Sequence, residues 1–183
     1  MQKILIPIAK GFEEIEAVTN IDVLRRAGFN VVTAGIGSKK IQGDHGIEIE
    51  TDLEIKEVQK EEITDVVLPG GMPGAANLRD SSELLQIIRD VNDRGGLCAA
   101  ICAAPMVLEA ADILEDKNAT SYPGFDDQMK SANYKTNRVV KDGNIITGRG
   151  PGVALEFALE IVEYLDDKNT ADELKEAMLV KEC

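Results

Sequence analysis

One cysteine, Cys102, stands where a short apolar strand is expected to turn sharply into a helix. Residues 96–101 lead into it, the small residues Ala103 and Ala104 follow it, and Pro105 suits the first turn of a helix. This arrangement predicts a nucleophile elbow, in which a strained turn lifts one side chain above the sheet. A cysteine in that position is expected to be a nucleophilic and oxidisable thiolate.

The other two cysteines are expected to be unreactive. Cys98 lies among apolar neighbours within the expected strand, which favours plain packing. Cys183 is the last residue, where a side chain is usually exposed and chemically incidental.

A helix N-terminus stabilises a thiolate by about 0.3–1 kcal/mol, or ~2 kcal/mol if partly buried. This corresponds to a pKa lower by at most about 1.5, so a strongly activated thiolate at Cys102 needs a further hydrogen-bond donor.

Three glutamates, Glu13, Glu14 and Glu16, stand at the start of the first expected helix. Carboxylates there complement the helix dipole, which is a sufficient explanation for each of them. The same loop follows the first strand, so it meets Cys102 at one edge of a parallel sheet. A glutamic acid that keeps its proton beside the sulfur would supply the missing donor, worth about 1.5–3 kcal/mol for a hydrogen bond to a charged group.

A glycine-rich segment, LPGGMPGA (68–75), follows another expected strand. Glycines permit positive φ and close backbone approach. The segment lacks the length and the lysine of a Walker phosphate-binding loop, and the chain has no GxGxxG motif. Two interpretations remain: the loop only turns the chain, or Gly71 directs a backbone N–H at a substrate oxyanion.

The only histidine, His45, lies in an expected hairpin and far from Cys102 in the sequence. A cysteine–histidine hydrolase needs a base within hydrogen-bond reach of the sulfur, and the residue after the cysteine is Ala103. His45 is therefore interpreted as an exposed surface residue.

The elements that must position these residues alternate strand and helix along the chain. Strands are expected at 3–8, 30–36, 64–68 and 96–101, hairpins over 40–50 and 137–147, and helices over 14–27, about 80–94, about 153–165 and from about 170. Repeated strand–helix units with buried strands indicate one doubly wound α/β domain over residues 1–183. In such sheets the chemistry belongs to loops that follow strands, here 11–16, 70–77, 102–105 and 148–152.

Local signals indicate the ends and the buried face of these helices. Gly28 closes the first helix, and Asp80 followed by Glu83 resembles the capping signal of the next one. The expected apolar stripe of the first helix has helical spacing and consists of Ile15, Val18, Ile21 and Leu24.

Composition narrows the classes of function. The 183 residues include 33 Asp and Glu against 20 Lys and Arg, a net charge of −13, which disfavours binding to nucleic acid through a basic face or to anionic membranes. No apolar run is long enough to span a bilayer, and the N-terminal segment is interpreted as a strand and not a signal peptide. The three cysteines show no CxxC or Cys/His metal spacing. We therefore expect a cytoplasmic protein without a metal site.

Five segments, in this order, make the chain resemble the ThiJ/PfpI family, in the branch that contains the protein deglycases: KGFEEIEAV (10–18), IDVLRRAG (21–28), VLPGG (67–71), AAICAAP (99–105) and GRGPG (148–152). Order and spacing fit from about residue 3 to residue 180. The resemblance implies a flavodoxin-like sandwich, with a mostly parallel sheet flanked by helices. It also implies a cytoplasmic homodimer that uses neither a metal nor an organic cofactor.

The resemblance further implies roles for individual residues. The family's cysteine corresponds to Cys102, and its protonated glutamate corresponds to Glu16 and to neither of the other two glutamates. The oxyanion-binding amides correspond to Gly71 and Ala103.

The chain departs from the family at Tyr122, where deglycase-branch proteins often carry a histidine. A phenol titrates near pH 10, so it donates a hydrogen bond but is a poor proton shuttle at neutral pH. Proton transfer is then expected to fall more heavily on Glu16, with Tyr122 as a substrate-binding residue.

The leading hypothesis is a cofactor-independent glyoxalase or deglycase, active against methylglyoxal-type aldehydes or early glycation adducts under oxidative or carbonyl stress. Cys102 would add to the aldehyde as a hemithioacetal while Glu16 relays a proton. The alternative is a non-enzymatic redox sensor or chaperone in which Cys102 is oxidised to a sulfenic or sulfinic state. Peptidase chemistry is disfavoured because the peptidase branch has a histidine directly after the nucleophile, where this chain has Ala103.

Overall fold

A computed structural model describes residues 2–180 and has a seven-stranded sheet at its centre. The strands of this sheet are β1 (Lys3–Ile8), β2 (Asn30–Gly35), β5 (Leu53–Glu54), β6 (Asp65–Leu68), β7 (Cys98–Ile101), β10 (Val139–Asp142) and β11 (Ile145–Gly148). Two small pairs lie outside it, the antiparallel β3 (Lys40–Gln42) with β4 (Glu48–Glu50) and the parallel β8 (Asn118–Ala119) with β9 (Asn133–Tyr134). The helices are α1 (Glu14–Arg26), α2 (Gly74–Arg79), α3 (Ser82–Asp93), α4 (Pro105–Ala110), α5 (Ala154–Leu165) and α6 (Lys168–Ala177).

The strand order is β10-β11-β7-β6-β1-β2-β5, and all neighbours pair in parallel except β10 with β11. The chain leaves β1 toward β2 on one side and returns to β6 on the other, so the winding direction reverses beside β1. Ligand sites of doubly wound sheets lie at this point, outside the carboxyl ends of the strands. The predicted architecture is confirmed.

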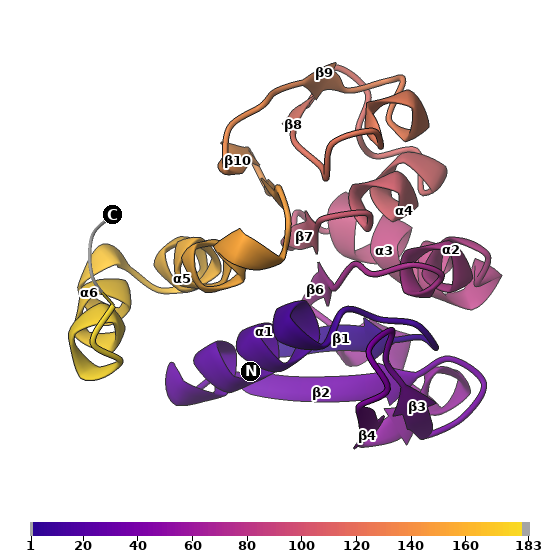
Figure 1. The fold of residues 1–183 in the computed structure, drawn as a ribbon, viewed down its shortest axis with the longest axis horizontal. Helices are drawn as coiled ribbons and strands as arrows, with labels where there is room; N and C mark the ends of the chain where they lie inside the picture. Colours follow the sequence, from indigo (N-terminus) through magenta and orange to yellow (C-terminus); the bar gives the residue numbers. More distant parts are fainter. Residues whose placement is uncertain (1, 181–183) are drawn as a thin grey trace.

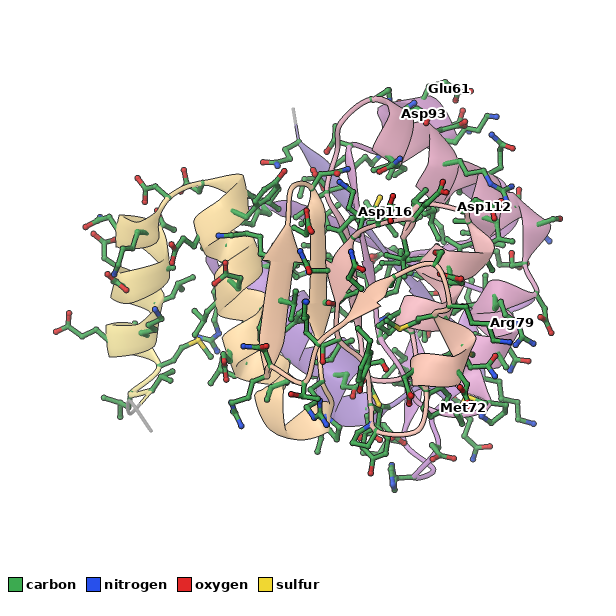
Figure 2. The ribbon with its side chains drawn as sticks, turned by 90° about the horizontal axis from the view of Figure 1, so that it is seen from above. Glu61, Met72, Arg79, Asp93, Asp112 and Asp116 are labelled. Carbon is green, nitrogen blue, oxygen red and sulfur yellow. The ribbon has the colours of Figure 1, made fainter. Side chains whose placement is uncertain are left out.

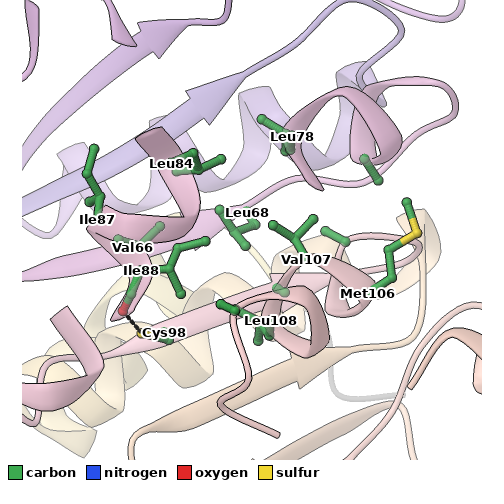
Figure 3. Packing of buried hydrophobic residues seen from close by; sticks show 14 of the residues in the cluster. Val66, Leu68, Leu78, Leu84, Ile87, Ile88, Cys98, Met106, Val107 and Leu108 are labelled. Atoms are coloured by element: carbon green, nitrogen blue, oxygen red, sulfur yellow. Dashed lines mark hydrogen bonds between the residues drawn. The ribbon is translucent and has the colours of Figure 1, made fainter. Parts of the chain in front are cut away.

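Helices cover both faces of the sheet. In Figure 1, α2, α3 and α4 lie together on one side of the molecule, and α5 with α6 lie at the opposite end. Alternate residues of β7 enter the two cores: Cys98 and Ala100 pack with side chains of α3 and α4, whereas Ala99 and Ile101 pack with those of α1 and α5. Figure 3 shows the first of these cores around Cys98.

Many of the acidic residues lie on the outside of the fold. Glu61 and Asp93 lie at the edge of the molecule in Figure 2, and Asp112 and Asp116, also labelled there, are exposed as well. A surface of this charge repels phosphate backbones. Among residues 2–180, no helix combines the length and the apolar character that a membrane span requires.

The predicted elements agree with the structure within two residues for the main strands and for α1, and both hairpins form. The capping prediction is wrong. Asp80 ends α2, a helix that the sequence analysis did not predict, and the N-cap of α3 is Ser81, whose Oγ accepts from the Leu84 N–H at 3.3 Å. The serine hydroxyl is the short polar group that reaches the third helical amide.

The predicted buried stripe of α1 is also wrong in its first turns. Ile15 and Val18 are 57% and 47% exposed, whereas Glu14, Glu16 and Ala17 are buried. The two glutamates accept hydrogen bonds from other loops, as described below, and these contacts fix the rotation of the helix. Buried polar groups need such partners, so here they override the apolar periodicity.

Candidate active site

Cys102 occupies a strained turn between β7 and α4. Its φ is +64°, in the left-handed region that non-glycine residues rarely adopt. Its N–H donates to the Gly148 carbonyl at 2.9 Å, and its carbonyl accepts from the Tyr122 N–H at 2.8 Å. Pro105 is the first residue of α4. The strand, strained turn and helix of the predicted nucleophile elbow are therefore all present.

Glu16 brings a buried carboxyl group to the sulfur of Cys102. Its side chain is 0% exposed, and its Oε2 accepts from the Gly70 N–H at 2.8 Å. Oε1 accepts no hydrogen bond from an N–H group of the described residues. The carboxyl group faces the thiol of Cys102. Burial raises the pKa of Glu16 to about 7, against the lowering effect of the Gly70 and Cys102 hydrogen bonds and with a further rise from the charge of Glu13.

The sulfur of Cys102 faces both this carboxyl group and two backbone donors. Burial raises the pKa of Cys102 to about 12, the Glu16 carboxylate adds to the rise, and the N–H groups of Gly71 and Ala103 oppose it. α4 has only six residues, and its N-terminus does not outweigh burial. A thiolate at Cys102 therefore requires that Glu16 hold the proton, because protonation removes the repelling charge and provides a donor.

Two consecutive glycines let the loop after β6 approach this pair. A Cβ at Gly70 would lie 2.7 Å from the Cβ of Cys102 and 2.8 Å from Oε2 of Glu16. Gly71 has a φ of +89°, and a Cβ there would lie 2.3 Å from the backbone N of Glu13. A role was predicted for Gly71 and none for Gly70, although the glycine pair directly after a buried strand was a usable signal.

Tyr122 is joined to the elbow through its backbone. Its backbone is bonded to Cys102, as described above, and its side chain is 47% exposed. A Cβ at Gly150 would lie 3.1 Å from the ring of Tyr122. The structure thus brings the loop after β8 and the loop after β11 together at the elbow.

His45 is exposed, as predicted, but it is not an isolated surface residue. Its ring Nδ1 lies 2.9 Å from Oε2 of Glu14, and Oε1 of Glu14 accepts from the N–H groups of His45 at 2.8 Å and Ile47 at 3.3 Å. Burial acts to raise the pKa of Glu14, but these hydrogen bonds together lower it. Glu14, which the helix dipole alone could explain, holds the β3–β4 hairpin against α1.

One group of described side chains has metal-ligand atoms within reach of one another. The ligand atoms of Glu13, Glu14 and His45 all lie within 4.8 Å. The Nδ1–Oε2 distance of 2.9 Å is that of a hydrogen-bonded pair, and Oε1 of Glu14 already accepts two N–H groups. We assign the cluster to pairing, and the expected independence from metals and organic cofactors stays a prediction.

Cys98 is fully buried. It is 0% exposed, and its Sγ donates to the Ile88 carbonyl at 3.7 Å (Figure 3). Burial raises the pKa of Cys98 to about 12, which fits the predicted packing role. Cys183 lies outside the described residues.

Comparison with known proteins shows the family and the fold of the chain. Residues 2–164 match the model of the DJ-1/PfpI family. The chain is 41% identical to the Parkinson disease protein 7 homolog of Danio rerio, over 99% of this chain and 98% of that protein. It is 35% identical to the glutathione-independent glyoxalase DJR-1.2 of Caenorhabditis elegans, over 93% and 91%. The structure of oxidized DJ-1 from Toxoplasma gondii superposes with a TM-score of 0.92 at 38% identity, over 98% of each chain. The resemblance to the ThiJ/PfpI family is therefore confirmed under another of its names, and the chain belongs to the DJ-1/PfpI family.

Proposed function

We propose that this protein is a cofactor-independent glyoxalase or deglycase that acts on methylglyoxal-type aldehydes or early glycation adducts in a reducing cytoplasm. The observation that carries the proposal is the buried carboxyl group of Glu16, in contact with the thiol of Cys102 and with its pKa raised to about 7. A group that titrates near the working pH can both give and take a proton in one catalytic cycle. The glyoxalase name of the nematode relative supports the same class of reaction.

The first step starts from the pair with one proton, held by Glu16, and the Cys102 thiolate adds to the aldehyde carbon of methylglyoxal. The electron pair of the C=O bond moves to oxygen, and Glu16 gives its proton to that oxygen, which leaves a hemithioacetal and a carboxylate. The N–H groups of Gly71 and Ala103 face the sulfur, so they can stabilise negative charge on an atom bonded to the reacting carbon.

Glu16 also suits the rearrangement that follows. Its carboxylate removes the proton from the former aldehyde carbon, and the electron pair moves to the ketone oxygen to form an enediolate. Glu16 then returns this proton to the neighbouring carbon, while the hydroxyl proton of the former aldehyde carbon passes to the ketone oxygen. The product is a lactoyl thioester on Cys102, which water cleaves to lactate and the thiol. Methylglyoxal and water are consumed and lactate is formed, with no change in oxidation state overall. Early adducts of the same aldehyde with amines present the same two carbons.

The test is lactate formation from methylglyoxal, with the D and L forms measured separately. Wild type should turn over, and both Cys102→Ser and Glu16→Gln should lose activity. Tyr122→His should raise kcat, because it adds a proton shuttle next to the elbow, whereas the matched control Tyr122→Phe should not. Unchanged turnover in Glu16→Gln would contradict the role of Glu16 as the proton relay. Absence of turnover by folded, reduced wild type would contradict the proposed enzymatic function.

A second candidate function is a redox sensor or chaperone controlled by oxidation of Cys102. The observation that favours it is the set of donors around the sulfur, because two backbone N–H groups and a protonated Glu16 would also bind a sulfinate. A relative has been solved as an oxidized protein. Mild peroxide should add two oxygens to Cys102 alone, and equal oxidation of Cys98 or Cys183 would remove the case for selectivity.

We also expect the protein to act as a homodimer. Ile15 and Val18 form an exposed apolar patch on α1, and a second copy is the partner that the family resemblance implies. Sedimentation of wild type should give a dimer, and Val18→Glu should give a monomer. The control is Leu179→Glu, which changes an 85% exposed residue elsewhere and should leave the dimer intact.

A further inference from the structure

The loop of the β3–β4 hairpin is bonded along the loop that carries Glu13. The Gly11 N–H donates to the Gln42 carbonyl at 2.9 Å, and the Asp44 N–H donates to the Phe12 carbonyl at 3.0 Å. The next residue, His45, pairs with the carboxylate of Glu14 as described above. His45 is thereby held against the start of α1 by backbone contacts that do not involve its ring.

The loop that carries Glu13 is also linked to Glu16, through hydrogen bonds to Gly70. The Glu13 N–H donates to the Gly70 carbonyl at 3.0 Å, and the Gly70 N–H donates to Oε2 of Glu16 at 2.8 Å. Gly70 is thus bonded to both glutamates, through its carbonyl to the backbone of Glu13 and through its N–H to the carboxylate of Glu16. The Glu13 side chain is only 13% exposed, and its Oε2 lies 3.7 Å from Nδ1 of His45.

The charge of Glu13 acts on both titrating groups, His45 and Glu16. The charged groups that face His45 are Glu14, Glu13 and Asp44. The hydrogen bond to Glu14, followed by the charges of Glu13, Glu14 and Asp44, raises the pKa of His45. The charge of Glu13 also disfavours the ionised form of Glu16. Both effects have the sign that Coulomb's law requires.

We propose that His45 is a positioning residue of the Cys102 site, which acts through Glu13 and tunes the proton affinity of Glu16. A positive His45 offsets the charge of Glu13, so that Glu16 ionises more readily. A neutral His45 leaves that charge unopposed, so that Glu16 keeps its proton to higher pH. This role rests on the proposed function of Glu16 as the proton relay.

The test is the pH dependence of the alkylation rate of Cys102 by iodoacetamide, followed by peptide mapping. The pair of Glu16 and Cys102 loses its first proton near pH 7, because burial raises the pKa of Glu16 to about 7. His45→Gln removes the cation, and the midpoint should rise by about half a pH unit, the size expected for one partly screened charge. His45→Arg makes the cation permanent, and the midpoint should fall below that of wild type.

Opposite shifts separate this role from a structural one, because loosening of the hairpin would move both variants in the same direction. In a Glu13→Gln background the difference between His45→Gln and His45→Arg should disappear. Equal midpoints in wild type, His45→Gln and His45→Arg, or a difference that survives Glu13→Gln, would overturn the proposal. Titration of the Glu16 carboxyl carbon by ¹³C NMR should rank the same three proteins in the same order of midpoint, even if one variant is less stable.

Alkylation does not depend on turnover. Absence of lactate formation would therefore remove the proposed enzyme without touching the coupling, and absence of the coupling would leave the enzyme in place.

Discussion

Cys98 and Cys102 stand at the two ends of β7, and their surroundings differ in kind. Burial raises the pKa of both thiols to about 12. Cys98 points into the core beneath α3 (Figure 3), whereas Cys102 lies past the end of the strand and borders the opposite core. Thiol acidity therefore does not distinguish the two residues.

The difference lies in the carboxyl group that each cysteine meets. Asp65 acts on Cys98 only through its charge, and its oxygens already accept from the Leu97 N–H at 2.9 Å and from the Thr64 hydroxyl at 2.6 Å. Glu16 keeps one oxygen for Cys102 and holds a proton near neutral pH. A buried cysteine becomes reactive when its neighbour can exchange a proton with it.

The largest expected effect comes from removing the sulfur at one end of the strand. Cys102→Ser should lower methylglyoxal turnover by about a thousandfold or more, because the nucleophile is lost. In the folded variant, iodoacetamide should then alkylate no residue of the segment from Cys98 to position 102. Cys98→Ser is the matched control. Peptide mapping distinguishes alkylation of Cys98 or Cys102 from alkylation of Cys183. Rapid alkylation of Cys98 in the folded protein would break the comparison.

Gly70→Ala should slow the chemistry of Cys102 although both cysteines stay in place. The new Cβ would lie 2.7 Å from the Cβ of Cys102 and 2.8 Å from Oε2 of Glu16, so we expect a loss of about 1–3 kcal/mol in the free energy of unfolding and slow alkylation of Cys102. Urea unfolding and alkylation rates measure both effects. Gly152→Ala is the control, since its Cβ would meet nothing within 4 Å, and an equal loss in that variant would contradict the steric explanation.

The carboxyl group at the Cys102 end should make stability depend on pH. The folded pKa of Glu16 is raised from 4.5 to about 7, so its contribution is fully present below pH 4.5 and is lost as the pH rises through 7. Relative to Glu16→Gln, wild type should lose up to about 3 kcal/mol of unfolding free energy between pH 5 and pH 8. Urea unfolding at both pH values measures this, and a constant difference would show that Glu16 does not titrate in that range.

The smallest effect should come from Cys98→Ala. It removes one buried sulfur atom from the core, which lowers the free energy of unfolding by about 1 kcal/mol. Alkylation of Cys102 and turnover should stay within about twofold of wild type, because no hydrogen bond of the elbow passes through Cys98. A larger loss of turnover would mean that the two ends of β7 are coupled through the core.

The sequence was sufficient for the elbow and for most of the sheet, because these follow from local signals. The apolar run before Cys102, the alanines after it and Pro105 act over a few residues, as do the turn signals of the hairpins. α2 was missed because it is only six residues long and begins at Gly74, which is a weak helix former.

The parts that the sequence left open depend on distant contacts. Glu14 and Glu16 have the same residue type at the same helix end, and only the family resemblance separated them. In the structure, Glu14 bonds to the hairpin residues His45 and Ile47, while Glu16 bonds to Gly70. Both contacts join segments that lie far apart in the sequence, and no local pattern indicates them.

The backbone of Cys102 has a consequence for how the protein matures. Its N–H and its carbonyl are held by Gly148 and Tyr122, both of which are synthesised after the cysteine. During translation, β7 and its thiol leave the ribosome before the segments that hold the turn in its left-handed conformation. The turn at Cys102 can therefore be completed only when the last strand of the sheet has docked, and until then the cysteine is free to adopt other backbone conformations.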